Sequence, residues 1–351
     1  MNKELHDIDR KLCAIQKTLF SHSYIRVQNY DEEFEKFCDS QFQYNPQFTY
    51  KKLRVERVIQ KLEQISIPQD TKWSAIFEEF RLYLLEYAYI LEKVGTDQFH
   101  TLNFFGNLTH TLIKKAEESL QGVKRIAPKV QSEKISAEKL GEILLGEVQK
   151  IGGFDWTVQY KDSASATVSI HAAKKQITIR KKAFFSEKRV QKLLVHEIHT
   201  HVKRSICGAK QPFGMFQIGL PGYIATEEGL AKYNEVQAGV TNSYFTKLQA
   251  LLVLATDKAS RSSFVELFSF VQQYIHDVKK AFRFCARIKR GMSDTSKPGG
   301  FLKDHIYFQG LLEIEDFVAH GGNIHELYVG KVSLDFLKKY KDVLQDELVW
   351  P

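Results

Sequence analysis

The sequence predicts an α+β fold that is mostly helical, with an N-terminal helical region and a small antiparallel sheet later in the chain. Apolar residues recur at helical spacing through most of the 351 residues, and three short segments between residues 156 and 180 alternate in polarity. The composition, 43% hydrophobic and 26% charged, is that of an ordinary globular protein. We expect two parts: residues 1–135, a helical region packed on the core, and residues 136–351.

The first part contains five segments with the apolar periodicity of helices. They are residues 4–19, 32–40, 50–64, 73–94 and 103–121. The segment 73–94 carries an apolar belt that includes Phe77, Leu82 and Leu85, and this belt is wide enough to be largely buried. Residues 124–136, which have mixed charges and one proline, are the best candidate for a linker.

The second part begins with a predicted helix at residues 137–151, which two glycines end. Residues 156–160, 166–170 and 176–180 then alternate as strands do, and residues 172–175 suit the turn of a hairpin. An edge strand can bind an extended peptide by strand addition, and residues 176–180 are a candidate for that role. An ordinary packed strand is the alternative.

The rest of the chain returns to helical patterns, joined by a loop at residues 291–300 that is rich in Gly, Ser, Thr and Pro and could border a cleft. The expected helices are residues 244–254, 261–275 and 278–288, one that begins near Phe301, and a final one at 333–344.

The net charge of +8 allows two interpretations. The basic residues are spread through helices, which is typical of solvated helix faces, but they would also attract an acidic partner. No nucleic-acid-binding motif is present, and aromatic residues are not interleaved with basic ones, so we expect no DNA or RNA partner.

The cysteines and the apolar runs bear on location. Cys13, Cys38, Cys207 and Cys285 are widely scattered and form no CxxC pair, which argues against a disulfide framework or a thiolate zinc site. The N-terminus lacks a signal-peptide pattern, and no stretch approaches the roughly 18–20 apolar residues of a membrane span. We expect a cytoplasmic protein with no membrane partner.

One predicted helix, residues 186–204, carries a metal-binding pattern. Its centre reads His-Glu-Ile-His-Thr-His, which is HExxxH with histidines at 196 and 201, whereas the familiar zinc helix is HExxH. On an ideal helix His196 and His201 point about 140° apart, and His196 and His199 about 60° apart. Geometry alone therefore favours the pair His196 and His199, and His196 can join His201 at one metal only if the helix is distorted, for instance by a π-bulge. The alternative is a helix with partly exposed histidines bonded to neighbours.

A second stretch, residues 221–231, supplies carboxylates. A Pro-Gly turn precedes Thr226, a suitable N-cap, so that Glu227 and Glu228 would lie in a first helical turn. There, acidic residues offset the helix dipole, which is one interpretation. The other is that one glutamate is a third metal ligand and leaves a fourth position for water.

These motifs together resemble those of the microtubule-associated tyrosine carboxypeptidase-like family, also labelled by its QEGLA motif. HEIHTH is followed by TEEGLA, and residues 290–307 are similar to the family's RG…F-x-KD-x-x-Y pattern. Two positions depart from the family: Glu227 stands where the label has Gln, and His199 stands where Gly is usual. Because glycine would ease a helical distortion, His199 leaves the helix geometry open.

The resemblance implies a zincin-like metallopeptidase core in residues 136–351, with one Zn²⁺ per chain. It implies that His196, His201 and Glu228 are the metal ligands and that Glu197 is the general base. It also implies removal of one C-terminal residue, with an aromatic one such as tyrosine preferred, from a peptide or protein tail; an acidic tail would suit the net charge.

A carboxypeptidase also needs a cation for the substrate's carboxylate and a donor for the oxyanion. Arg290 or Lys303 is a candidate for the first role, and Tyr307 or His305 for the second, although structural ion pairing around Lys303 and Asp304 is an equal alternative. Three aromatic residues could line the side-chain pocket or belong to the core. They are Phe213, Phe216 and Tyr223. The rival functions are a zinc endopeptidase of other specificity and a non-catalytic binding protein that keeps the fold.

Overall fold

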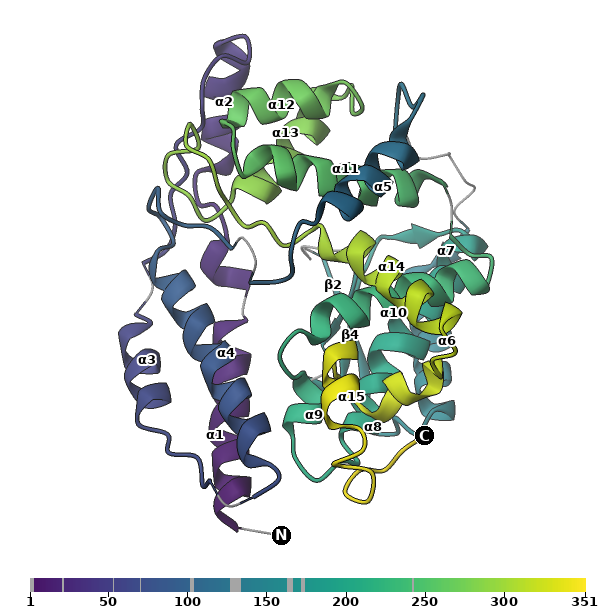
Figure 1. The fold of residues 1–351 in the computed structure, drawn as a ribbon. Coiled ribbons are helices and arrows are strands. Elements are labelled where there is room, and N and C mark those ends of the chain that lie inside the picture. Colours follow the sequence, from purple (N-terminus) through teal and green to yellow (C-terminus); the bar gives the residue numbers. More distant parts are fainter. Residues whose placement is uncertain are drawn as a thin grey trace. The chain divides into compact units, whose positions relative to one another are not determined.

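The computed structural model describes the chain except for residues 1, 2, 21, 53, 70, 102, 103, 127–133, 163–166, 172, 173 and 242. The described residues form two compact units, each made of two segments. The first unit is Met1–Pro128 with Ser243–Gln309, and the second is Lys129–Asn242 with Gly310–Pro351. The architecture is α+β and mostly helical, as predicted (Figure 1).

The first unit is built from helices. They are α1 (Lys3–Leu19), η1 (His22–Ile25), α2 (Tyr30–Asp39), α3 (Glu56–Glu63), α4 (Ser74–Glu92), α5 (His110–Leu120), α11 (Ser243–Ala259), α12 (Phe264–Gln272) and α13 (Val278–Lys289). Figure 1 shows α1 and α3 beside α4, and α5 beside α11. Helix α14 (Ile306–Ala319) begins in this unit and continues into the second.

An aromatic core explains why residues 243–309 belong with the N-terminal region. Phe37 of α2 is fully buried, and its ring lies 4.7 Å from that of Phe268, centroid to centroid, and 5.2 Å from that of Phe282. Such aromatic pairs add stabilisation beyond the area that they bury. The predicted boundary near residue 135 lies close to Pro128, where the first segment of the first unit ends. We did not predict that residues 243–309 form the second segment of that unit. The division into domains at 135 stays a prediction.

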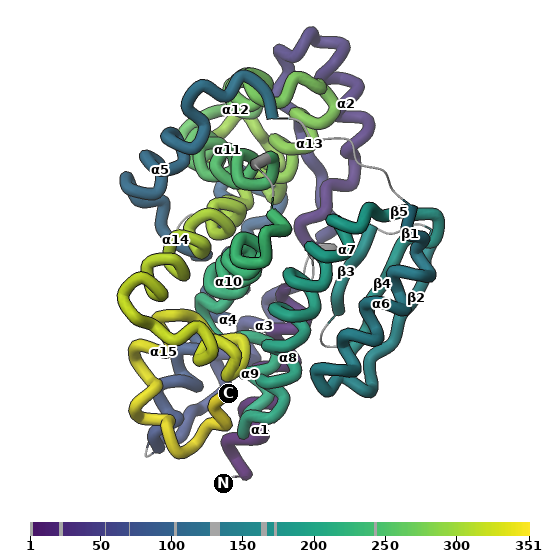
Figure 2. Tube along the Cα trace, turned by 90° about the vertical axis from the view of Figure 1, so that its right-hand side faces the viewer, coloured from purple at the N-terminus to yellow at the C-terminus, as the bar shows by residue number. Residues whose placement is uncertain are grey.

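The second unit combines small sheets with helices. Its elements are β1 (Ile135–Ser136), α6 (Ala137–Lys150), β2 (Thr157–Lys161), β3 (Val168–His171), β4 (Gln176–Arg180), β5 (Phe184–Phe185), α7 (Glu187–Leu193), η3 (Leu194–Val202), α8 (Lys203–Gly208), α9 (Met215–Ile218), α10 (Tyr223–Gln237), η4 (Ile324–Val329) and α15 (Leu334–Tyr340). In Figure 2, α6 runs along the sheet, and its apolar face joins β4, α7 and η3 in one core.

The main sheet is mixed, so the prediction of an antiparallel sheet was wrong in part. The strand order is β2-β4-β3: β3 and β4 pair antiparallel, as the predicted hairpin requires, but β2 and β4 pair parallel, with Thr157 opposite Gln176. Strand β4 takes the centre because Ile177, Thr178 and Ile179 are all buried and need cover on both faces. The predicted turn contains residues 172 and 173, which lie outside the described residues.

This order also corrects the peptide-binding role considered for residues 176–180. Both edges of β4 are already hydrogen-bonded, to β2 and to β3. A strand with two partners has no free edge to offer a peptide. The alternative, an ordinary packed strand, is therefore confirmed.

Several helices begin later than their apolar patterns suggested. Helix α3 begins at Glu56 and not near residue 50; the Tyr50 hydroxyl donates to the carbonyl of Met292 at 3.1 Å and accepts from the amide of Gly291 at 2.7 Å. Helix α14 begins at Ile306 and not near Phe301, since the Phe301 amide donates to the carbonyl of Ile288. Tertiary hydrogen bonds hold these residues outside the helix.

No helix among the described residues is long and apolar enough to cross a membrane.

Candidate metal centre

The helix that carries HExxxH is continuous from α7 through η3 to α8, and its middle is a π-helix. Ser186 caps it as predicted, with its hydroxyl accepting from the Arg189 amide. The π-helical part, Leu194–Val202, spans all of the histidines. The Thr200 hydroxyl donates to the carbonyl of Val195, five residues earlier, at 2.9 Å. The distortion that HExxxH requires is therefore present, and His199 does not prevent it.

The π-helix brings His196 and His201 together. In a π-helix a residue and the fifth after it lie close on one side, because the backbone bonds close over five residues. The two imidazole centroids are 4.8 Å apart, with the rings at 73°. His199 faces elsewhere: its Nε2 lies 3.0 Å from Glu147 Oε1 of α6. The pair that ideal helical geometry favoured, His196 and His199, is therefore not the pair that forms.

Two glutamates face this pair of histidines. Glu228 Oε2 of α10 lies 3.8 Å from His196 Nε2 and 3.8 Å from His201 Nε2. Glu197 forms a group with the same two histidines, since ligand atoms of His196, Glu197 and His201 all lie within 4.8 Å of one another. Two imidazoles and a carboxylate make a common set of three protein ligands, and ligands at about 2.0–2.2 Å from one ion stand about 3.3–3.6 Å apart. The residues therefore fit a divalent metal ion.

Helix α10 begins earlier than predicted, which changes the meaning of its glutamates. Gly222, in a left-handed conformation with φ of 71°, precedes the first residue, Tyr223. Thr226 is not the N-cap: its buried hydroxyl accepts from the Leu334 amide at 3.0 Å. Glu227 and Glu228 therefore lie beyond the first turn, and the helix-dipole interpretation does not apply to them.

Gly229, which follows Glu228, is needed for close packing of α10 on α14. A Cβ atom at Gly229 would stand 2.2 Å from the backbone carbonyl of Gly310. Since neither backbone can yield as a side chain would, only glycine fits at this contact. The glycine of the Glu-Glu-Gly-Leu-Ala stretch thus fixes where α10 holds Glu228.

Behind each histidine lies a second acid. His196 Nδ1 is 2.6 Å from Glu235 Oε1, and His201 Nδ1 is 2.9 Å from Glu227 Oε1. Sequence reasoning missed Glu235. A signal was available: Glu235 follows Glu228 by seven residues, two helical turns, and so occupies the same face of α10.

Both outer acids are held by cations. Glu227 accepts from Arg204 Nη1 and from Lys331 Nζ, each at 2.6 Å. Glu235 accepts from Lys232 Nζ at 2.8 Å and pairs with Lys192 Nζ at 3.2 Å.

These cations decide the charge of the two acids. Burial alone would raise the pKa of Glu235, but the His196 hydrogen bond and the Lys232 charge outweigh it and hold the pKa at about 2. Burial would also raise the pKa of Glu227, but the charges of Lys331 and Arg204 outweigh it and hold this pKa below the usual range. The pKa of His201 is raised, because Glu227 and Glu228 outweigh the effect of burial, which lowers it.

Arg290, Lys303 and Tyr307 belong to the first unit. The guanidinium of Arg290 lies 4.5 Å from the ring centroid of Phe301, and its buried Nε has no hydrogen-bond partner among the described residues. Lys303 Nζ lies 5.5 Å from the ring centroid of Phe105. The association of these three residues with the histidine cluster stays a prediction.

The ion pair at Asp304 is formed by a residue that sequence reasoning did not name. Arg287 Nη2 donates to Asp304 Oδ1 at 2.8 Å, and Arg287 Nε lies 2.7 Å from Asp304 Oδ2 in the same ion pair. His305 is fully buried, and its Nε2 lies 3.2 Å from the carbonyl oxygen of Gly106. Burial lowers the pKa of His305. One of the two ring nitrogens of His305, Nε2, is thus engaged by the fold.

The aromatic residues considered for a specificity pocket are mainly core. Phe213 and Phe216 are 1% and 0% exposed, and Phe216 packs edge-on against Phe336. Tyr223 lies against Gly219, where a Cβ atom would stand 2.2 Å from its ring. The alternative that we gave for Phe213 and Phe216, burial in the core, is confirmed.

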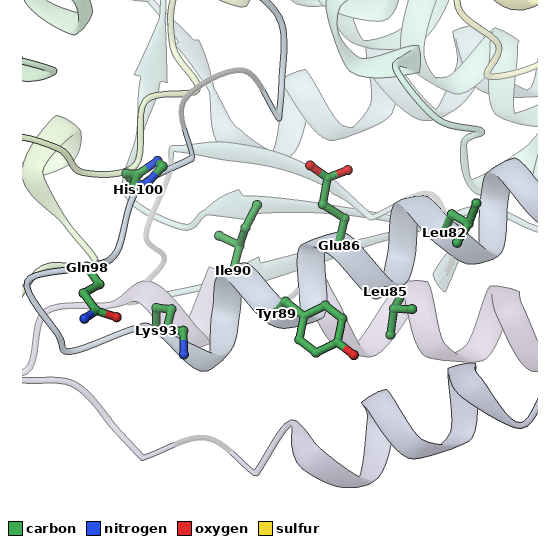
Figure 3. A pocket seen from close by; sticks show the side chains of 8 residues that line it. All are labelled: Leu82, Leu85, Glu86, Tyr89, Ile90, Lys93, Gln98 and His100. Atoms are coloured by element: carbon green, nitrogen blue, oxygen red, sulfur yellow. The ribbon is translucent and has the colours of Figure 1, made fainter.

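A groove of about 710 Å³ lies in the first unit, along α4 and the segment that follows it (Figure 3). It is lined by Leu82, Leu85, Glu86, Tyr89, Ile90, Lys93, Gln98 and His100. None of the predicted site residues is among them. Leu82 is 48% exposed, so the expected burial of the α4 belt holds for Phe77, which is 0% exposed, but not for Leu82.

Comparison with known proteins agrees with the motifs. Residues 35–351 match the family model described as microtubule-associated tyrosine carboxypeptidase. The protein named microtubule-associated tyrosine carboxypeptidase 1 of Mus musculus is 30% identical over 297 residues, which are 83% of this chain and 55% of the relative. The protein of the same name from Homo sapiens is 29% identical over 297 residues, with the same two coverages. The chain spans about half the length of these relatives. The chain belongs to the microtubule-associated tyrosine carboxypeptidase family.

Proposed function

We propose that this protein is a zinc-dependent metallocarboxypeptidase that removes one C-terminal residue, of aromatic and tyrosine-like character, from peptides or proteins. The observation that carries the proposal is the convergence of His196 Nε2, His201 Nε2 and Glu228 Oε2, with 3.8 Å from the carboxylate to each imidazole. Membership of the family and the names of the relatives support the carboxypeptidase class.

His196, His201 and Glu228 are the residues that would hold the zinc ion, one per chain. When bound, zinc supplies Lewis-acid activation of a water molecule and of the scissile carbonyl. The proposed core is zincin-like, since the small sheet of β2, β3 and β4 is followed, after the two-residue strand β5, by the helix that carries HExxxH. We assign catalysis to residues 136–351, which contain all of the proposed site residues.

Glu197 is the proposed general base. It follows His196 directly and belongs to the same cluster of ligand atoms as the two histidines. Its carboxylate accepts a proton from the attacking water and later passes that proton to the leaving amine of the departing residue. A protein that only bound metal would not need this acid.

Arg290 or Lys303 is the proposed partner of the substrate's terminal carboxylate, and Tyr307 the proposed donor to the oxyanion. Arg290 is the stronger candidate of the two cations, because its buried Nε has no hydrogen-bond partner among the described residues. A buried guanidinium of this kind gains most from a bidentate carboxylate. His305 is the alternative donor, and its Nε2 lies 3.2 Å from the carbonyl oxygen of Gly106.

The proposed substrate is a protein or peptide tail in the cytoplasm, and an acidic tail would suit the net charge of +8. The relatives are named as microtubule-associated, which agrees with a cytoplasmic location.

A digest of a peptide library, read by mass spectrometry, tests the proposal. We expect zinc-loaded protein to shorten peptides by one C-terminal residue, with tyrosine or another aromatic residue at the end cut fastest. Cleavage at internal bonds would replace the carboxypeptidase assignment with an endopeptidase one. If no peptide is cut by protein that contains one zinc per chain, the catalytic proposal is wrong.

A further inference from the structure

Each histidine of the candidate centre lies between two acids, one on either side of its ring. On the outer side, His196 Nδ1 meets Glu235 at 2.6 Å and His201 Nδ1 meets Glu227 at 2.9 Å. On the inner side both Nε2 atoms lie 3.8 Å from Glu228.

We propose that Glu235 and Glu227 are positioning residues, which keep a proton on Nδ1 of His196 and His201 and so leave the Nε2 lone pairs directed at the metal position. The inference rests on the proposed metal centre, but it concerns an arrangement that this chain makes before any metal binds.

The outer acids can act in this way because they accept hydrogen bonds and do not donate them. Glu235 is fully buried and faces Lys232 and Lys192, while Glu227 is 3% exposed and faces Arg204 and Lys331. A carboxylate that is paired with two cations is an acceptor only, so the imidazole nitrogen that meets it has to be the donor. A proton on Nδ1 leaves Nε2 as the free ligand atom of a neutral imidazole.

The two acids differ in what else they hold. Arg204, 0% exposed, extends from Glu227 to the carbonyls of Leu327, at 2.8 Å, and Val332, at 2.7 Å. Glu227 therefore joins His201 to residues near the C-terminus of the chain. The cations at Glu235 come from α7, which continues into the histidine-bearing η3, and from α10, which carries Glu228. A change at Glu227 should thus affect both metal binding and stability, and a change at Glu235 mainly metal binding.

The chain offers a matched control on the same helix. His199 also meets a glutamate, Glu147, with 3.0 Å between Nε2 and Oε1, but its side chain is 42% exposed and outside the cluster. The variant Glu147→Gln removes the same kind of charge from a histidine that we do not assign to the metal.

The first test measures zinc affinity of the full chain by competition with a chelating dye, for wild type, Glu235→Gln, Glu227→Leu and Glu147→Gln. We expect Glu235→Gln to weaken zinc binding by about 10–100-fold, as outer carboxylates of zinc histidines do. Glu227→Leu, which removes the acceptor that a glutamine would keep, should weaken it similarly and also lower the melting temperature of the metal-free protein. Glu147→Gln should match wild type. If Glu235→Gln also matches wild type, the inference is wrong.

The second test does not depend on metal or on a stable variant. Nitrogen-15 NMR of metal-free wild-type protein with labelled histidine reports which ring nitrogen carries a proton. At a pH high enough for both rings to be neutral, we expect a proton on Nδ1 and a bare Nε2 in both His196 and His201, and a bare Nδ1 in either would overturn the inference. Should wild type bind no zinc while both Nδ1 atoms are protonated, the proposed function fails and the positioning role stands, so the two failures are distinguishable.

Discussion

The two units both bury charged side chains, but they complete the hydrogen bonds of those charges differently. In the first unit Lys289 is 0% exposed, and its Nζ donates to the carbonyls of Ser262 at 2.5 Å, Lys297 at 2.7 Å and Ala259 at 3.4 Å. In the second unit, Glu235 and Glu227 meet cations on one side and an imidazole on the other.

The difference separates structural from reactive burial of charge. Three carbonyls use all three donors of Lys289, so its network ends in the backbone and offers nothing to a ligand. The network of the second unit ends at Nδ1 of two imidazoles, and the other nitrogen of each ring, Nε2, lies 3.8 Å from Glu228 Oε2. Buried charge alone therefore does not indicate a site, whereas buried charge that directs unused ligand atoms to one point does.

The sharpest test of this contrast is Glu197→Gln, which removes the proposed base from the reactive network. Hydrolysis should fall by about 10²–10⁴-fold, because proton transfer by a positioned side chain contributes that much. The zinc content should remain at one per chain, since Glu197 is not a proposed ligand. Rates of C-terminal residue release, together with metal analysis, check both statements; cleavage at the normal rate would contradict the assignment.

Lys289→Met should break the structural network and leave the reactive one intact. Methionine has a similar size but no donors, so three carbonyls lose a partner, and we expect the free energy of unfolding to fall by about 3 kcal/mol. Urea unfolding measures this. Zinc affinity of the folded variant should equal that of wild type, and a weakened affinity would show that the two networks are not separate.

The Arg287–Asp304 pair should reveal itself in the pH dependence of stability. Burial would raise the pKa of Asp304, but Arg287 and Arg290 outweigh it and hold the pKa below the usual value. A lowered folded pKa stabilises the protein above the unfolded value of about 3.9, and this stabilisation is lost as the pH falls through the folded pKa.

Comparison of wild type with Asp304→Asn isolates this contribution. At pH 7 we expect wild type to be more stable by about 1.5–3 kcal/mol, as for a hydrogen bond to a charged group. The difference should shrink as the pH falls below about 4, because the unfolded chain then binds a proton at Asp304 whereas the folded protein binds it only at lower pH. Urea unfolding at both pH values measures it, and a difference that stays constant across them would contradict the ion pair.

The smallest effect should come from His199→Ala. His199 is the partly exposed histidine of the motif, and its bond to Glu147 is worth about 0.5–1 kcal/mol. Thermal unfolding should change little, and zinc affinity should not change. A large loss of zinc would mean that His199 is a ligand after all.

The parts of the fold that local patterns determine were predictable. Helix α13 was expected at 278–288 and spans Val278–Lys289, because its apolar stripe is regular and Asp277 caps it. Helix α5 begins at His110 and not at 103, since Thr109 is the cap and its hydroxyl accepts from the Leu112 amide. That signal was in the sequence and was overlooked.

Features that depend on tertiary structure were not predictable. Alternation of polarity identifies strands but carries no information on their order, so the central place of β4 and its parallel pairing with β2 were missed. At the site, the motifs supplied His196, His201 and Glu228; the spacing from Glu228 places Glu235 on the same face of α10, but its contact with His196, 39 residues away, is visible only in the structure. Thr226 had the composition of a cap, yet its hydroxyl serves Leu334 instead.

The π-helical segment Leu194–Val202 has one consequence for how the motif relates to the shorter HExxH. A π-helical turn amounts to a single-residue insertion in an α-helix. Here the extra residue can be taken as His199, whose side chain points away from Glu228 and meets Glu147 instead. Deletion of His199 would leave His-Glu-Ile-Thr-His, whose outer histidines stand four apart and share one face of a regular helix. The two spacings are thus alternative solutions to one coordination problem, separated by a single codon.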